Sequence, residues 1–310
     1  MRTPLSYVLL AATLALAGCD IDLDDVSMGA KEEESFFYNY DFKPGSRLLL
    51  DNYNGPIEIT SWEKPKIEIS GARFANSRDR LRDFKIEISR GAESINIRTV
   101  PPLDRTGNTG ARYVIRLPRQ AVLELVKSTN GSLRVNGIEG AATLRTTNGA
   151  VRVSSVTGTV SATSTNGGIE CIGLSGSVTA RTTNGRIKLE DIAGPMEATT
   201  TNGGIVAVMT RATDDRKMRF ATTNGGIELR LPDALKNDVR ASTTNGSIDV
   251  KLPSSSSFQI AARTTGSSVR SEFNVQGEVT KKRIEGKVGV GGPLLDLSTS
   301  NGSISLQRAL

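Results

Sequence analysis

The feature that most constrains this chain is the dipeptide Asn-Gly, which returns at a fixed step along the sequence. Five copies follow one another every 18 residues, and two more follow at steps of 22 and 21 residues. Thr265-Gly266 is a degenerate copy without the Asn, and Asn301-Gly302 ends the series. One Asn-Gly indicates only a turn, whereas a phased series indicates a repeat protein whose units stack. The asparagines of the phased copies are Asn130, Asn148, Asn166, Asn184, Asn202, Asn224 and Asn245.

Each repeat unit contains two segments in which apolar and polar residues alternate, which is the period of a β-strand. One segment follows each Asn-Gly, as with Ile187 and Leu189, and another precedes it, as with Val178 and Ala180. A glycine between the two segments indicates a second corner, so each unit has two short strands and two corners. The glycines at the second corner are Gly140, Gly158, Gly176 and Gly194.

Two architectures fit such a unit. In a parallel β-solenoid each coil lies on the preceding one at about 4.8 Å, with backbone hydrogen bonds between coils. In an antiparallel meander the same Asn-Gly would form tight hairpin turns. The constant step favours the solenoid, because stacked coils must have equal perimeters whereas hairpin loops vary in length. We therefore predict an all-β fold, a parallel β-solenoid with two short strands per coil of about 18 residues.

The residue types at the corners agree with stacking. Asn tolerates the left-handed backbone conformation, Gly adopts positive φ freely, and identical side chains one coil apart can hydrogen-bond in ladders. We predict a structural ladder of the phased asparagines, and a second ladder of the Thr-Thr pairs before them, such as Thr182-Thr183. A flat threonine array is also typical of ice binding, but the inner Thr of each pair falls on the apolar phase and is predicted to cap the core.

The first residues of the sequence predict where the protein resides. Met1-Arg2 is positively charged, residues 5–17 are uncharged and mostly apolar, and Leu16-Ala17-Gly18-Cys19 closes this run. A run of 13 residues is too short to cross a hydrocarbon layer of about 30 Å as a helix. The pattern resembles the lipobox of bacterial lipoproteins, so residues 1–18 are predicted to be a lipoprotein signal peptide and Cys19 the lipidated residue. A secretory signal peptide with an incidental cysteine is the alternative.

The rest of the chain divides into three predicted parts. Residues 19–40 are acidic and lack an apolar pattern, which predicts a solvated tether above the membrane. Residues 41–118 contain alternating segments without the repeat, which predicts a less regular β N-terminal part that continues the sheets and covers one open end. Within it, residues 76–84 are charged and predict a short helix or an extended loop. Residues 119–310 are the predicted repeat solenoid.

Composition argues against most kinds of catalytic and metal site. The chain has no histidine, which excludes serine triads and the zinc sites that use histidine. Its two cysteines, Cys19 and Cys171, do not make a disulfide framework or a CxxC motif. Cys171 falls on the inward phase and is predicted to be a small buried residue rather than a reactive thiol. The acidic tether lacks the spacing of an EF-hand, so we predict no catalytic residue, no metal and no cofactor.

The two predicted strand faces differ in charge. The net charge of +6 comes without any Lys- or Arg-rich block, so nucleic acid is not a predicted partner. Outward residues of the first strand mix both signs, whereas those of the second strand include four arginines against Glu197. These arginines are the candidate ligand-binding surface, for an anionic envelope polymer or an envelope protein, unless they only keep the sheet soluble. The four residues are Arg145, Arg181, Arg219 and Arg240.

Three segments carry a resemblance to a known family. They are Leu48-Leu49-Leu50-Asp51-Asn52-Tyr53-Asn54-Gly55-Pro56-Ile57-Glu58-Ile59 with Ser61-Trp62, then Tyr113-Val114-Ile115-Arg116-Leu117-Pro118, then the Thr-Thr-Asn-Gly-Gly-Ile units. Together they resemble the bacterial toast-rack candidate adhesins, a domain of unknown function, over about residues 41–310. The resemblance implies a β-solenoid-like module that faces the surface or the periplasm, sometimes encoded with envelope-stress components. It implies no particular active site.

These observations predict a non-enzymatic lipoprotein of the bacterial cell envelope, held to a membrane by its lipid anchor and facing the periplasm or the surface. Its adhesin-like solenoid would present flat sheet faces for binding or scaffolding. One alternative is a carbohydrate-active enzyme on a β-helix scaffold, which would need a groove with two carboxylates about 5–10 Å apart. Another is an envelope-stress sensor whose solenoid contacts a membrane signalling partner.

Overall fold

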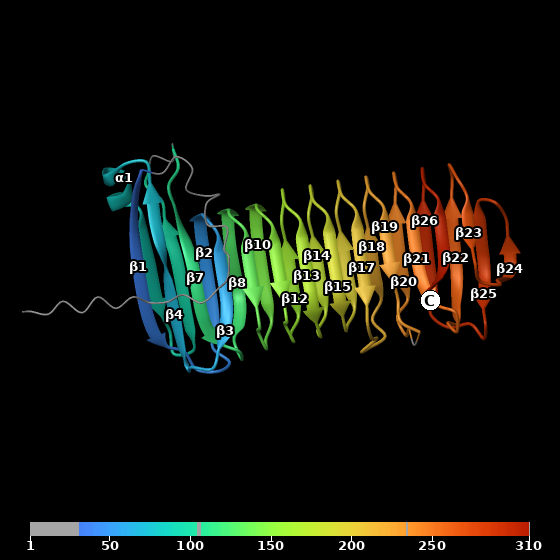
Figure 1. Cartoon of the computed structure of the whole chain (residues 1–310), viewed down its shortest axis with the longest axis horizontal. Coiled ribbons are helices and arrows are strands. Elements are labelled where there is room, and N and C mark those ends of the chain that lie inside the picture. The colour runs from blue at the N-terminus through green and yellow to red at the C-terminus, as the bar shows by residue number, and fades with distance from the viewer. Residues whose placement is uncertain (1–30, 104–106, 234, 310) are drawn as a thin grey trace, which may run out of the picture.

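A computed structural model describes residues 31–309 except residues 104–106 and 234. In this part the chain forms two long β-sheets that face each other along one axis, with strand β1 near one end and strand β24 at the other (Figure 1). The predicted signal peptide and Cys19 lie outside the described residues. No helix of the described part is long and apolar enough to cross a membrane.

The first sheet, called sheet A, has 13 strands. Their order across the sheet is β1 (Glu32–Asp41), β4 (Lys66–Ala75), β7 (Gly110–Pro118), β3 (Ile57–Trp62), β9 (Leu133–Asn136), β11 (Val151–Ser154), β13 (Ile169–Leu174), β15 (Ile187–Ile192), β17 (Ile205–Met209), β19 (Ile227–Arg230), β21 (Ile248–Pro253), β27 (Ile304–Ala309) and β23 (Val269–Ser271).

The second sheet, called sheet B, has 14 strands. Their order is β24 (Gln276–Val279), β25 (Arg283–Val288), β22 (Phe258–Thr264), β26 (Leu294–Thr299), β20 (Val239–Thr243), β18 (Met218–Ala221), β16 (Met196–Thr199), β14 (Val178–Arg181), β12 (Val160–Thr163), β10 (Ala142–Asn148), β8 (Val122–Asn130), β2 (Arg47–Asn54), β6 (Ser94–Val100) and β5 (Lys85–Arg90).

Successive coils stack in parallel and in constant register, which confirms the solenoid and excludes the hairpin meander. Val151 lies opposite Ile169 in sheet A, and Ile169 opposite Ile187 one coil further. The Asn-Gly corners lie in single file along one edge. The Asn166 side-chain amide donates to the Asn148 side-chain oxygen at 2.8 Å, and the same bond joins the other phased asparagines. The predicted asparagine ladder is therefore present.

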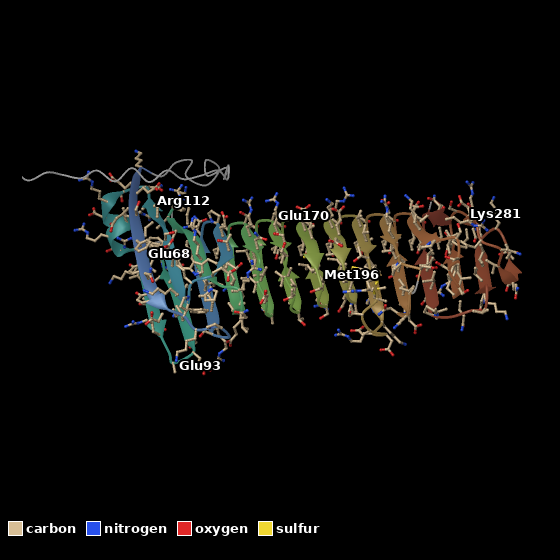
Figure 2. The ribbon with its side chains drawn as sticks, turned by 60° about the horizontal axis from the view of Figure 1, so that its bottom comes forward. Glu68, Glu93, Arg112, Glu170, Met196 and Lys281 are labelled. Atoms are coloured by element: carbon tan, nitrogen blue, oxygen red, sulfur yellow. The ribbon has the colours of Figure 1, made fainter. Side chains whose placement is uncertain are left out.

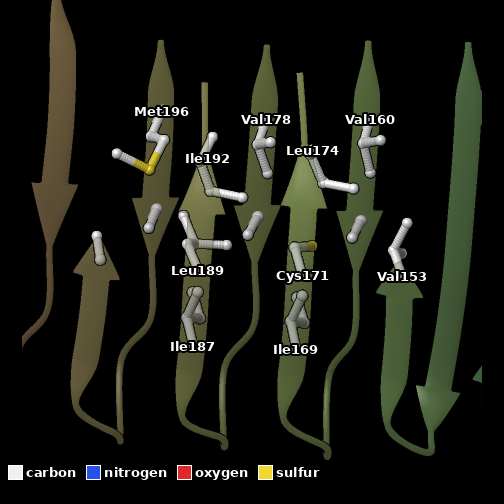
Figure 3. Close-up of a cluster of buried hydrophobic side chains, with 14 of the residues drawn as sticks. Val153, Val160, Ile169, Cys171, Leu174, Val178, Ile187, Leu189, Ile192 and Met196 are labelled. Carbon is white, nitrogen blue, oxygen red and sulfur yellow. The ribbon is translucent and has the colours of Figure 1, made fainter. Parts of the chain in front are cut away.

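The core is a narrow double layer of inward side chains that repeats from coil to coil (Figure 3). Branched residues such as Ile187 and Leu189 in sheet A occur with small residues such as Ala180 and Ala198 in sheet B, all fully buried. This alternation of large and small side chains fills the space between two close sheets. It leaves little room for aromatic rings, which is consistent with their share of only 5% of the sequence.

Glycine at the Asn-Gly corner has a different role from the predicted one. The sequence predicts positive φ there, but neither the Asn nor the following Gly of the repeat adopts it. Instead, a Cβ atom on Gly203 would lie 2.0 Å from the carbonyl oxygen of Gly185 in the preceding coil. The same clash recurs at Gly167 and Gly225. Glycine is needed at this corner because the backbones of neighbouring coils touch, not because of its backbone torsions.

The inner threonines also differ in detail from the prediction. Each is buried and caps the core as expected, yet it does not bond to the next threonine. The Thr182 hydroxyl donates to the carbonyl oxygen of Gly167 in the preceding coil at 2.9 Å, and Thr200 donates to Gly185 at 3.0 Å. The hydroxyl thus satisfies a backbone carbonyl of the neighbouring coil instead of joining a threonine ladder.

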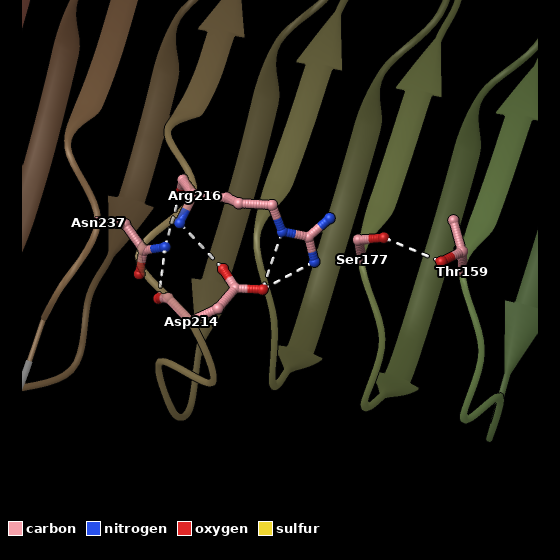
Figure 4. Close-up of polar contacts among 5 residues, drawn as sticks. All are labelled: Thr159, Ser177, Asp214, Arg216 and Asn237. Carbon is pink, nitrogen blue, oxygen red and sulfur yellow. Dashed lines mark hydrogen bonds and ion pairs between the residues drawn. The ribbon is translucent and has the colours of Figure 1, made fainter.

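The coil that ends at Asn224 is four residues longer than the first units, and the extra residues lie in the loop between β17 and β18. Asn237, which is fully buried, donates to the carbonyl oxygens of Asp214 and Arg216 at 2.9 and 2.7 Å (Figure 4). The guanidinium of Arg216 pairs with the Asp214 carboxylate and holds its pKa below the usual range. The four extra residues of this unit therefore lie in the loop, and the strands on either side keep their places in the stack.

The predicted acidic tether extends too far into the folded part. The prediction places residues 32–40 in the tether, but they lie in β1, which pairs antiparallel with β4. Phe36, Tyr38 and Tyr40 alternate along β1 and pack against the core, with the Phe36 ring 5.4 Å from the Tyr113 ring. The acidic residues that indicated solvation are partly paired, since Arg73 contacts Glu34 at 2.7 Å.

The less regular N-terminal part continues both sheets, as predicted. Within residues 41–118, strands β4, β7 and β3 extend sheet A, and strands β2, β6 and β5 extend sheet B. Residues 76–84 include a short helix, α1 (Arg78–Asp83), which matches one of the two expected conformations. Ser77 begins it by accepting a hydrogen bond from the Arg80 amide at 3.5 Å.

At the other end, the order of coils in space departs from their order in the sequence. Strands β26 and β27 lie between the coil of β20 and β21 and the coil of β22 and β23. Asn301 therefore stacks on Asn245, with a 2.8 Å side-chain hydrogen bond. The degenerate Thr265-Gly266 corner lies beyond Asn301, and Gly266 donates its amide to the Ser300 carbonyl at 2.7 Å.

Candidate functional site

The four predicted arginines lie on the outer face of sheet B, where they form two short columns rather than one stripe. Arg145 and Arg181 share a column, separated by Thr163. Arg219 and Arg240 are direct neighbours in the next column, which also holds Glu197. The offset follows from the sequence, since the first two lie three residues before an Asn-Gly and the last two lie five residues before one.

Acidic neighbours occupy part of this face. Arg181 forms an ion pair with Glu197 at 2.7 Å, and Arg240 with Asp296 at 3.6 Å. Arg145 and Arg219 are exposed and have no ion pair among the described residues. Two guanidinium groups are thus available for an external anion. The other two are held by carboxylates, of which Glu197 is solvent-exposed and Asp296 is half-buried.

The outer face of sheet A carries a ladder of mixed charge, as predicted. Glu170 lies between its two stack neighbours, 3.6 Å from Arg152 and 3.3 Å from Lys188 (Figure 2 labels Glu170). Hydrogen bonds from Lys188 to Glu190 and Glu170 raise the pKa of its ammonium group. The outward residues of this column, in stack order, are Arg134, Arg152, Glu170, Lys188, Val206, Glu228 and Asp249.

Two adjoining hollows lie beside this ladder, at the beginning of the sheet A strands. Their volumes are about 380 and 140 Å³, and Arg186 lines both. Sequence analysis missed this groove, although the change from Asn-Gly-Arg to Asn-Gly-Gly in neighbouring units signals a missing side chain. The larger hollow is lined mainly by Arg186, Gly204, Val206, Gly226, Glu228 and Asp249.

No group of three or more His, Cys, Asp or Glu side chains in the described part could hold a metal ion. Cys171 is buried among the inward residues of β13, as predicted. Burial, with a smaller effect of Glu170, raises the pKa of its thiol to about 12. The thiol therefore stays protonated at neutral pH, which is the inert state of a structural cysteine.

The stacked coils and their phased corners agree with the sequence comparisons. The family model Toastrack DUF4097 matches residues 47–248. The chain belongs to the Toastrack DUF4097 family. The matched region covers β2 to the first residue of β21, and so includes most of the regular coils of this Toastrack chain. The family is a domain of unknown function and assigns no active site.

Three solved structures are similar to this Toastrack chain, each over 89% of its length. A candidate adhesin from Parabacteroides distasonis is 10% identical, with a TM-score of 0.49 and 97% of its chain covered. A candidate adhesin from Bacteroides fragilis is 14% identical, with a TM-score of 0.41 and 97% covered. A candidate cell adhesion protein from Clostridium sporogenes is 11% identical, with a TM-score of 0.21 and 100% covered. No curated protein matches the sequence at a significant level.

Proposed function

We propose that this Toastrack protein is a non-enzymatic, adhesin-like lipoprotein of the cell envelope that binds an anionic envelope polymer on the outer face of sheet B. The lipobox ending at Cys19 supports the anchor. Arg145 and Arg219 support the binding surface, because both are exposed on a long flat sheet and neither has an ion pair within the described part of the chain. The two arginines decide the proposed ligand class, because guanidinium groups pair with carboxylates and phosphates in a fixed planar geometry.

Regular spacing makes a polymer a better ligand than a small anion. Arg145 and Arg181 are two coils apart, which corresponds to about 10 Å along the stack. A polymer with repeated anionic groups can contact several arginines at once. After the first contact, each further contact forms within the same complex, which raises the overall affinity. Glu197 would be displaced from Arg181 at little cost, since this ion pair is exposed to solvent. Asp296 is half-buried between Arg240 and Arg263, so Arg240 would keep this partner while it contacts the polymer.

Binding is tested with polygalacturonate and polyphosphate, with neutral dextran as the reference polymer. We expect the full chain to bind both anionic polymers, more weakly as salt rises, and not dextran. Changing Arg145, Arg181, Arg219 and Arg240 to Ser is expected to weaken binding at least tenfold. The control removes the same charge from sheet A, by changing Arg116, Arg134, Arg270 and Arg308 to Ser. Equal binding by the two variants would disprove the role of sheet B.

The lipid anchor is tested separately by labelling a bacterial expression host with radioactive palmitate. The full chain is expected to carry the label and to sediment with membranes, since several acyl chains hold a protein stably where one does not. Cys19→Ser is expected to lose both properties. Cys171→Ser removes the other cysteine of the chain and is expected to keep both. Membrane retention of a Cys19→Ser protein without label would show that the anchor is not a lipid on this residue.

A further inference from the structure

The groove on sheet A exists because some coils have glycine where others have a side chain. Two residues after each Asn from Asn148 to Asn245, the stack holds Ala150, Gly168, Arg186, Gly204, Gly226 and Ser247 in turn. Gly204 and Gly226 are adjacent and form the floor of the larger hollow. Arg186 lies on one side of them and Ser247 on the other.

The fold does not require glycine at these two positions. Neither residue has positive φ. A Cβ atom on Gly204 or Gly226 would have its nearest neighbour at 3.4 Å, whereas Cβ atoms on the preceding Gly203 and Gly225 would lie 2.0 and 2.1 Å from a carbonyl oxygen. Serine already occupies the equivalent position at Ser247. Backbone geometry and packing therefore do not require glycine at these positions, and the lack of a side chain leaves the hollow open.

The groove carries opposite charges at its two ends. Arg186 is exposed and has no ion pair among the described residues. Glu228 and Asp249 lie opposite one another on adjacent strands at the other end. Glu228 contacts Arg230 at 3.3 Å and Lys251 at 3.4 Å, while no hydrogen bond or ion pair reaches the half-buried Asp249 carboxylate within the described part. Desolvation, and then the charge of Glu228, raise the pKa of Asp249 against a smaller opposing effect of Lys251, so a cationic ligand group beside this carboxylate would favour its charged form.

We propose that this groove binds a short peptide with free termini, whose carboxylate pairs with Arg186 and whose amine pairs with Asp249. Arg186 and Asp249 are three coils apart, about 14 Å along the stack. An extended peptide spans about 3.3–3.6 Å per residue, so about three to four residues cover this distance. None of the lining residues is aromatic, which disfavours a stacked sugar ring, and Val206 offers an aliphatic contact. This site lies on the sheet opposite the arginine face and is independent of the function proposed above.

Three peptides test both charges, namely tri-alanine, N-acetyl-tri-alanine and tri-alanine amide. Calorimetric titration of the full chain is expected to show binding of tri-alanine at least tenfold tighter than of either blocked peptide. The double variant Gly204→Ser, Gly226→Ser should fill the floor and lose at least tenfold in affinity, with a thermal melt no lower than that of the parent. Because a floor variant could fold poorly, Arg186→Ala and Asp249→Asn provide surface variants with the same expected loss, and Arg134→Ala, outside the groove, is expected to bind like the parent.

Four results would overturn the proposal. They are equal affinity for the three peptides, no saturation by tri-alanine up to about 20 mM in the folded chain, unchanged binding by the folded floor variant, and unchanged binding by both surface variants. Phosphoethanolamine also carries an anionic and a cationic group, and serves as the probe for a lipid headgroup. Tighter binding of phosphoethanolamine than of tri-alanine, in competition for the same site, would assign the groove to a headgroup instead.

Discussion

Replacing Gly203 with alanine is expected to break the stack, whereas replacing its neighbour Gly204 with alanine is expected to leave it intact. The Cβ atom that Gly203→Ala adds would lie 2.0 Å from the Gly185 carbonyl oxygen, so two coils would have to separate at a point where both sheets hold them together. Overpacking a rigid site costs about 1–3 kcal/mol and occasionally more. We expect the upper end here, because the obstacle is backbone.

At Gly204 the sign of the effect is expected to reverse. The nearest atom to a Cβ would be 3.4 Å away, and φ at Gly204 is not positive. Alanine in place of glycine then stabilises a protein by about 0.4–1 kcal/mol, by restricting the unfolded chain. Chemical denaturation of the two variants beside the parent measures both effects. Similar losses of unfolding free energy in the two variants would contradict the view that coil contact, rather than backbone torsion, requires glycine at the corner.

The second large effect concerns the inserted C-terminal coil, and Leu297→Asp is expected to detach the end of the rod. Leu297 on β26 is fully buried, with β20 on one side and β22 on the other. Loss of a buried leucine costs about 2–5 kcal/mol even without a charge, and an unpaired buried carboxylate adds to this cost. Strands β22 and β23 pair with β26 and β27 and not with β20 and β21 in the described structure, so they lose their connection to the stack.

Amide hydrogen exchange over residues 258–288 measures this detachment. In the parent these amides are expected to be protected, and in Leu297→Asp they are expected to exchange rapidly while β10 to β19 stay protected. Leu294→Asp is the matched control, because Leu294 belongs to the same strand but is 38% exposed. Continued protection of residues 258–288 in the Leu297→Asp protein would show that the distal strands hold on to the stack without the inserted coil.

Local pattern and topology were predictable to different degrees. Period-two alternation and a constant step predicted the strands, their inward residues such as Cys171, the parallel stacking and the asparagine ladder, because all of these depend on residues one coil apart. The end of the tether was misplaced because charges in residues 32–34 outweighed the alternation of Phe36, Tyr38 and Tyr40. The arginines were correctly placed on the outer face of one sheet, but their two columns needed a count from each Asn-Gly.

By itself the sequence determined the solenoid, since a repeated unit with two strands and two corners has few ways to bury its apolar side chains. Only the tertiary structure decided which coil lies on which at the C-terminal end, because the apolar pattern of β26 and β27 fits either side of β22 and β23. The tertiary structure also explains why the corners require glycine, and it shows where the missing side chains of other glycines leave a groove. Both depend on distances between backbones from different coils, which no single stretch of sequence contains.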